Sequence, residues 1–184
     1  MNYSRGIACT LLLLAAAGPG RAQSEPKPEW QEFRSEEGNF LLWVPAKPEE
    51  IKVAGCPPGA RVWQASGDEL LTLFQFGFIG KQKPADGAQA QDFLEGLGRE
   101  TAESLKGKVL DGRKITLGGW PGRETRIRFD AGEIPMCLLD RVFLVRDVKL
   151  FVRIIVPESH RDSPAHRKIL DSFKLVDESR VARE

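Results

Sequence analysis

The sequence predicts an α+β domain in which a mostly antiparallel sheet is sandwiched between helices. One observation is a succession of runs rich in β-branched and aromatic residues, separated by short polar turns. Such short links join antiparallel neighbours, since parallel strands need a long crossover. The other observation is that only two stretches repeat their apolar residues at the spacing of a helix. Strands therefore outnumber helices in the predicted fold.

The first residues have the features of a secretory signal peptide. Arg5 precedes an apolar run over residues 7–17, and the small residues Gly20 and Ala22 fit a cleavage site. This run is shorter than the roughly 20 apolar residues that span a membrane as a helix. We therefore expect cleavage near Ala22, a secreted or periplasmic protein, and no integral membrane segment after processing. An uncleaved membrane anchor is the alternative.

The rest of the chain divides into three parts. Residues 23–29 are polar and contain prolines, which predicts a flexible leader, and residues 177–184 predict a charged tail. Residues 30–176 are expected to form a single α+β domain. Two of the 27 basic residues leave with the signal peptide, so 25 remain against 26 acidic residues. This balance gives no electrostatic reason to bind nucleic acid or anionic lipid.

Four pairs of strands are predicted, each a pair of β-rich runs joined by a short turn. They cover residues 30–34 with 40–44, 61–65 with 70–79, 109–117 with 123–130, and 138–145 with 150–156. Both faces of the run 70–79 are apolar, which predicts a strand covered on both sides. Glu124, Arg126 and Arg128 alternate with apolar residues, which predicts one solvated face near a sheet edge.

Two helices interrupt the strands. Residues 86–106 repeat apolar side chains at helical spacing, and Gly107 ends the pattern. Ser163 followed by Pro164 is a typical helix start, since serine caps the first turn and proline fits its first position. This second helix is expected to reach Phe173 and to be followed by an extended piece over 174–176.

Short motifs accompany this order of elements. They are a Trp-x-x-Phe start at Trp30, a strand with Gly38, Phe40 and Pro45, a Pro121-Gly122 turn, and a closing Leu-Asp-Ser-Phe-Lys-Leu over 170–175. The pattern over about residues 30–176 resembles the Mog1/PsbP-like α/β/α sandwich. That family includes nuclear-transport, photosystem-associated and bacterial envelope members, so the resemblance implies a binding or assembly role without shared catalytic residues. Because its motifs are turn and packing residues, no functional position is carried over.

Motifs of catalysis are absent from the sequence. It contains no Gly-x-Ser-x-Gly elbow, no phosphate-binding glycine loop, no His-Glu-x-x-His and no Cys-x-x-Cys. Glu158, His160, Asp162 and His166 crowd one segment and have the chemistry of zinc ligands. Charged residues in a loop before a capped helix are normally solvated, so no metal and no cofactor are expected.

The predicted function is that of an exported, non-catalytic binding, adaptor or assembly-support module with a protein partner in the cell envelope or outside the cell. One alternative is a small hydrolase or metal-dependent enzyme centred on His160 and His166. Another is an apolar small-molecule or lipid carrier with a pocket of several hundred Å³ between the sheet and the helix over 86–106.

The candidate binding residues are Trp120, Arg126 and Arg128. Trp120 is expected at a hairpin tip, where an exposed tryptophan anchors a partner. Arg126 and Arg128 project from a solvated strand face and suit an anion-binding surface, although an edge protected by charges explains them equally well.

Cys56 and Cys137 are the only cysteines left after removal of the signal peptide. A matched pair in an exported chain predicts a disulfide between them. The alternative is two buried, reduced thiols, since Cys137 lies beside an apolar strand.

Overall fold

The computed structural model describes residues 30–66, 72–80 and 87–177. The predicted signal peptide at 1–22, the leader at 23–29 and residues 178–184 of the predicted tail lie outside the described residues. So does the start of the strand predicted over 70–79. Within the described ranges, no helix is long and apolar enough to cross a membrane.

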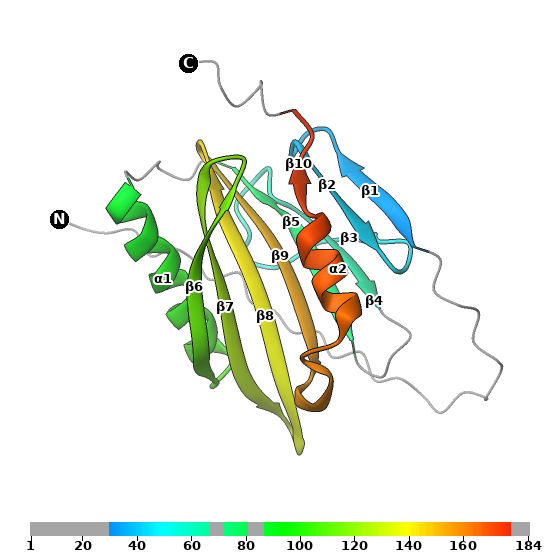
Figure 1. The fold of residues 1–184 in the computed structure, drawn as a ribbon, viewed down its shortest axis with the longest axis vertical. Coiled ribbons are helices and arrows are strands. Elements are labelled where there is room, and N and C mark those ends of the chain that lie inside the picture. The colour runs from blue at the N-terminus through cyan, green and yellow to red at the C-terminus, as the bar shows by residue number, and fades with distance from the viewer. Residues whose placement is uncertain (1–29, 67–71, 81–86, 178–184) are drawn as a thin grey trace.

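The strands form two antiparallel sheets (Figure 1). The small sheet contains β1 (Gln31–Ser35), β2 (Phe40–Val44) and β10 (Lys174–Leu175), with β2 in the middle. The large sheet contains β3 (Glu49–Ile51), β4 (Arg61–Ser66), β5 (Leu73–Ile79), β6 (Lys108–Leu117), β7 (Trp120–Ala131), β8 (Ile134–Val145) and β9 (Val148–Pro157). Its strand order is β3-β4-β5-β9-β8-β7-β6, so β3 and β6 are the outer strands.

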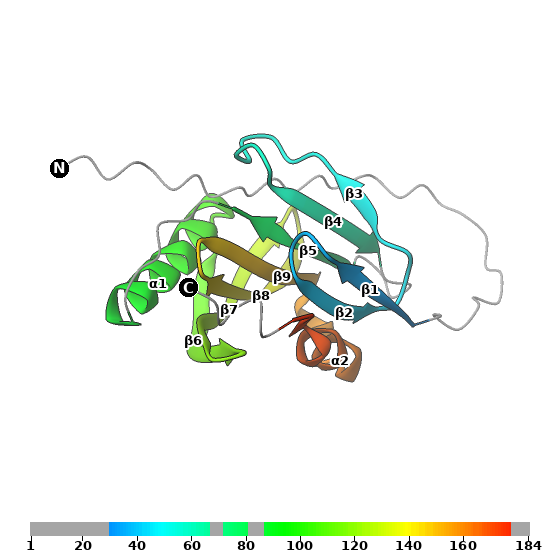
Figure 2. The same cartoon turned by 90° about the horizontal axis from the view of Figure 1, so that it is seen from above.

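The helices lie on opposite faces of the large sheet (Figures 1 and 2). Helix α1 (Gly87–Ser104) packs across β6, β7 and β8 on one face. Helix α2 (Pro164–Ser172) and the small sheet cover the other face, after the short 3-10 helix η1 (Glu158–His160). The predicted α+β class with an antiparallel sheet between helices is confirmed, and the second helical layer also contains the small sheet.

Apolar side chains fill the space on both faces of the large sheet. An aromatic cluster that includes Phe40, Phe76 and Phe173 lies between the small sheet, α2 and the large sheet. Two further apolar clusters lie on the α1 side, one of them around Leu94 and Val142. Because successive residues of a strand face opposite sides, each central strand contributes to both layers.

The turn between β6 and β7 is tighter than predicted. Trp120, Pro121 and Gly122 belong to β7, so the turn is made by Gly118 and Gly119 alone. These two glycines have φ of 55° and 83°, a conformation that other residues adopt only with strain. The short strand β3 was not predicted from the sequence.

The predicted disulfide between Cys56 and Cys137 is wrong. Cys137 is a free, fully buried thiol whose side chain packs on the α2 side of β8. Cys56 packs against the cluster of Val142 and Leu144 on the α1 side. The large sheet separates the two residues because the side chains of β8 alternate between its faces.

Candidate functional site

A charged cavity of about 310 Å³ opens between α2 and strands β6 to β8. We call it the charged groove. Its charged lining contains five arginines against four carboxylates, which are Arg113, Arg126, Arg141, Arg161 and Arg167 with Asp111, Glu124, Asp162 and Asp171. Leu139, His166 and Leu170 complete the lining. A surface with this composition suits a charged ligand.

The strand register brings opposite charges face to face. Asp111 lies opposite Arg126, and Arg113 lies opposite Glu124. A β-bulge between Val109 and Asp111 produces this pairing, since an uninterrupted ladder would have put Asp111 one residue further along β7. The bulge leaves no clear signal in the sequence, so these pairs were not predicted.

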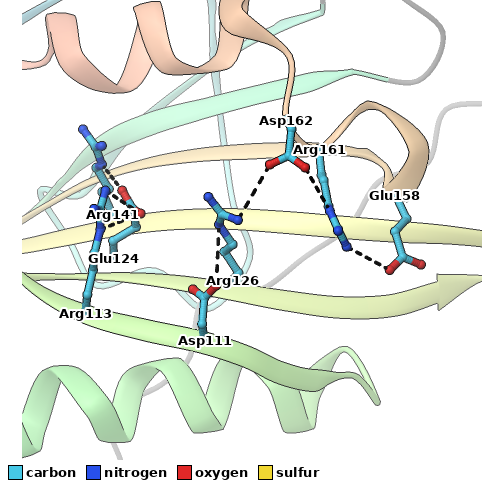
Figure 3. Close-up of polar contacts among 8 residues, drawn as sticks. All are labelled: Asp111, Arg113, Glu124, Arg126, Arg141, Glu158, Arg161 and Asp162. Carbon is cyan, nitrogen blue, oxygen red and sulfur yellow. Dashed lines mark hydrogen bonds and ion pairs between the residues drawn. The ribbon is translucent and has the colours of Figure 1, made fainter.

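Glu124 is the centre of one half of the groove (Figure 3). Its carboxylate accepts hydrogen bonds from Arg113 Nε at 2.9 Å and from Arg141 Nε at 2.6 Å. Arg141 also donates to the Leu170 carbonyl at 2.8 Å and to Asp171 at 3.0 Å, which ties the strand to α2. Burial opposes ionisation of Glu124, but the two arginines outweigh it and lower its pKa.

The expectation that Glu124 faces solvent is wrong. Its side chain projects on the same face as Arg126, as the alternation predicted, yet the residue is only 4% exposed. Helix α2 and two arginines cover this part of the face. The alternation of a strand predicts which side chains share a face, but not which other element lies above them.

Arg126 is the centre of the other half of the groove, and its guanidinium has longer ion pairs than those around Glu124. Its Nε lies 3.9 Å from Asp111 and its terminal nitrogen lies 3.8 Å from Asp162. Both distances exceed the range of a hydrogen bond. The Nε is buried and has no hydrogen-bond partner among the described residues. Asp162 is held more closely by Arg161, at 3.2 Å (Figure 3).

The structure brings only one of the three predicted binding residues into the charged groove. Arg126 lines it, whereas Arg128 pairs outside it with Glu158 at 2.9 Å and Asp130 at 3.7 Å. Trp120 is half-buried and lines a separate, open hollow of about 730 Å³ beside the β6–β7 turn.

The two histidines lie in different surroundings. His160 is exposed in η1, as expected. His166 is only 2% exposed, lines the charged groove and packs its ring against Phe74, so the expectation that solvent surrounds it is wrong. Cys137 is buried nearby, and its burial raises the pKa of the thiol, which disfavours the nucleophilic thiolate. The described residues include no group of three side chains placed to hold a metal ion.

A second, much smaller cavity lies between α1 and the large sheet. Its volume is about 30 Å³, which is room for one water molecule and too small for the lipid pocket expected for a carrier. Lys149 lines it and is 8% exposed. Burial, followed by the charge of Arg153, lowers the pKa of Lys149 to about 8.

Comparison with known proteins identifies the fold. No family model and no curated protein matches the sequence. The solution structure of PsbP (CyanoP) from Synechocystis sp. PCC 6803 matches with a TM-score of 0.58, 14% identity, and coverage of 85% of this chain and 98% of that one. The Ran-binding protein Mog1p from Saccharomyces cerevisiae matches with a TM-score of 0.51, 13% identity, and coverage of 82% and 97%. The chain therefore has a Mog1/PsbP-like fold, as the sequence resemblance predicted.

Proposed function

We propose that this chain is an exported, non-catalytic binding module whose charged groove holds an acidic segment of a protein partner. The observation that carries the proposal is Arg126. Its buried Nε has no hydrogen-bond partner within the described part of the chain, and its ion pairs are long. A buried donor without a partner is costly, and the Arg126 side chain as a whole is 29% exposed, so a carboxylate that enters the groove can pair with the accessible part of this guanidinium.

Arg167 supports the same proposal from the opposite wall. It lies on α2, is exposed, lines the groove and makes no ion pair with the residues that the structure describes. The groove lining thus contains one more arginine than carboxylates. The added negative charge of a partner would balance this excess.

The non-catalytic part of the proposal rests on the chemistry of the groove lining. Arginines bind and orient anions but keep their protons at neutral pH, so they supply no general base, and His166, the imidazole of the lining, is only 2% exposed and packs against Phe74. Cys137 is fully buried and has a raised pKa, so it lacks the properties of a nucleophile. Export is supported by the sequence features of residues 1–22, and a location in the envelope or outside the cell follows from export.

A protein partner is also in keeping with the fold. Mog1p, which shares it at 13% identity, is a Ran-binding protein. We take from this likeness only that the fold can present a surface to another protein, since function lies in particular sites and not in the fold.

The test is capture of partners from an envelope extract by the tagged chain over residues 23–184. Arg126→Gln and the double variant with Arg167→Gln remove groove cations, and Arg34→Gln is the control because Arg34 is exposed on β1 and pairs with Glu36. We expect the same partner on the wild type and the control, and at least a tenfold weaker affinity for Arg126→Gln, about the loss for truncating one side of a charged hydrogen bond. Equal capture by all variants would contradict the proposal.

A further inference from the structure

One outer strand of the large sheet is long and open. The outer strand β3 has 3 residues, whereas β6 has 10. Among the described strands β6 pairs only with β7, and most of its residues are exposed. Proteins usually end a sheet with a short or covered strand, because a free edge presents unpaired backbone groups to other chains. The edge at β3 is protected by its length, whereas the longer edge at β6 is protected only by its charged side chains and by a bulge near its start.

The bulge divides β6 into two parts. Leu110 is the extra residue of the bulge and is 42% exposed, so regular pairing stops there. From Asp111 to Leu117 the register with β7 is continuous. This part of the edge therefore has the regular ladder that an added strand continues.

Backbone groups of three residues point to the open side. A two-residue hairpin makes Leu117 and Trp120 a hydrogen-bonded pair, and the pairs of an antiparallel ladder alternate between bonded and non-bonded. Gly112, Lys114 and Thr116 therefore direct their amides away from β7. The residue opposite Thr116 is Pro121, which has no amide to donate and fits a non-bonded position.

The charged groove and the open hollow both border strand β6. Asp111 and Arg113 line the charged groove, and Lys114, Ile115 and Thr116 line the open hollow with Trp120. Side chains of an added strand would alternate between the two faces of the sheet, as they do in β6 itself. Arg113 and Ile115 lie on one face of β6 and Lys114 lies on the other, so the acidic side chains of an alternating strand would meet Arg113 or Lys114, and its apolar side chains would lie on the opposite face.

We propose that the acidic partner segment binds as an added β-strand along the free edge of β6, between Asp111 and Leu117. This inference rests on the function proposed above and specifies the form of the partner. Backbone hydrogen bonds to the edge hold the segment, and the side chains around the two hollows select its sequence. A second copy of β6 is a poorer occupant, since each β6 has three cationic residues, Lys108, Arg113 and Lys114, against Asp111 alone.

The test uses end-blocked octapeptides added to isotope-labelled protein over residues 23–184. The probe alternates Glu and Val. One control peptide has Lys in place of Glu, and another has N-methyl groups on alternate amides, which keeps the charges but removes the donors. We expect NMR shifts along β6 and slower hydrogen exchange at Gly112, Lys114 and Thr116 with the probe, and at least tenfold weaker binding of both control peptides.

A matched pair of variants tests the edge from the side of the protein. Thr116→Pro removes an outward amide without removing a bond to β7, whereas Thr116→Ala removes only the side chain. We expect the proline variant to bind the probe at least tenfold more weakly and the alanine variant to bind it within twofold of the wild type. Circular dichroism checks that both variants fold, and the N-methyl peptide tests the same bonds if the proline variant does not.

The outcomes separate this inference from the function on which it rests. Equal binding of the N-methyl peptide would overturn strand addition and leave an acidic groove ligand in place. Equal binding of the Lys peptide would overturn both. Absence of shifts along β6 with the probe, or dimerisation through β6 in sedimentation, would overturn the strand proposal, while the capture experiment with Arg126→Gln would still decide the function.

Discussion

Lys149 is a buried cation with no direct counter-ion in the described part of the chain. It is 8% exposed, and none of the described residues makes an ion pair or hydrogen bond with it. Asp140 is near enough to favour the charged amine, but Asp140 is already paired with Arg153 at 3.0 Å. Burial therefore dominates and lowers the pKa of Lys149 from 10.5 to about 8.

Replacement of Lys149 by methionine is expected to stabilise the protein at pH 7. Folding lowers the pKa of the wild-type Lys149 amine from 10.5 to about 8. At pH 7 the charged amine therefore lowers the free energy of unfolding by about 3 kcal/mol, and methionine removes this cost. The unfolded chain binds more protons than the folded one between these two pKa values, so wild-type stability rises with pH across that window. The stability advantage of Lys149→Met is thus full below pH 8 and lost near pH 10.5.

Urea unfolding at pH 7 and pH 10 measures this advantage, with Lys47→Met at an exposed lysine as the control. A stability difference that does not change with pH would show that packing, and not charge, is responsible.

The sequence identified some residues of the charged groove and missed others for a physical reason. Arg126 was found because a strand with charges on one face is visible in the sequence. Asp111 was not paired with Arg126 because the bulge that aligns them depends on backbone contacts within the folded sheet. The contribution of α2, including Arg167, depends on packing between elements that are distant in the sequence.

At the scale of elements, most strands and helices were predictable because short turns and caps mark where they begin and end. The strand pairs and both helices were recognised because their turn and cap residues have strong local preferences. Strand β3 has 3 residues, two of them glutamates, so neither length nor composition distinguishes it from a loop. Its strand conformation comes from pairing with β4, and tertiary pairing of this kind is not visible in local patterns.

Gly77 in the centre of β5 shows how closely the strands approach. A Cβ atom there would lie 2.2 Å from the Arg61 carbonyl oxygen, a backbone atom that cannot move without distorting β4. We expect Gly77→Ala to destabilise the protein by about 3 kcal/mol, at the upper end for added volume in a packed core. Gly80→Ala is the control, because a Cβ atom at Gly80 meets no atom of the described residues within 4 Å. Chemical unfolding of the two variants measures the difference, and equal stability would show that the sheet adjusts at Gly77.

At the scale of the whole molecule, the large sheet separates the hydrophobic core on the α2 side from the one on the α1 side. Strands β8 and β9 are central in this sheet and contribute side chains to both sides, so loss of either layer exposes apolar surface on the same strands. The sequence indicated that strands are covered on both faces, since the run over 70–79 is apolar throughout. It did not show which element covers which face, and for that reason the disulfide prediction was wrong.

Cys137 offers a direct measure of how cooperatively these layers unfold. Its thiol is fully buried on the α2 side of the sheet, and burial raises its pKa, so a thiol reagent reaches a reactive form only after the surrounding core opens. If the two layers unfold together, the labelling rate of Cys137 in native buffer should be at least about a thousandfold below that of the unfolded chain, and it should rise with urea in parallel with the loss of circular dichroism. The labelling rate of the Cys137→Ala variant measures the reaction of any other thiol and is subtracted. Fast labelling at low urea, before circular dichroism changes, would show that α2 and the small sheet detach locally while the large sheet stays folded. The charged groove would then have a mobile wall, because Arg141 holds α2 through the Leu170 carbonyl and Asp171.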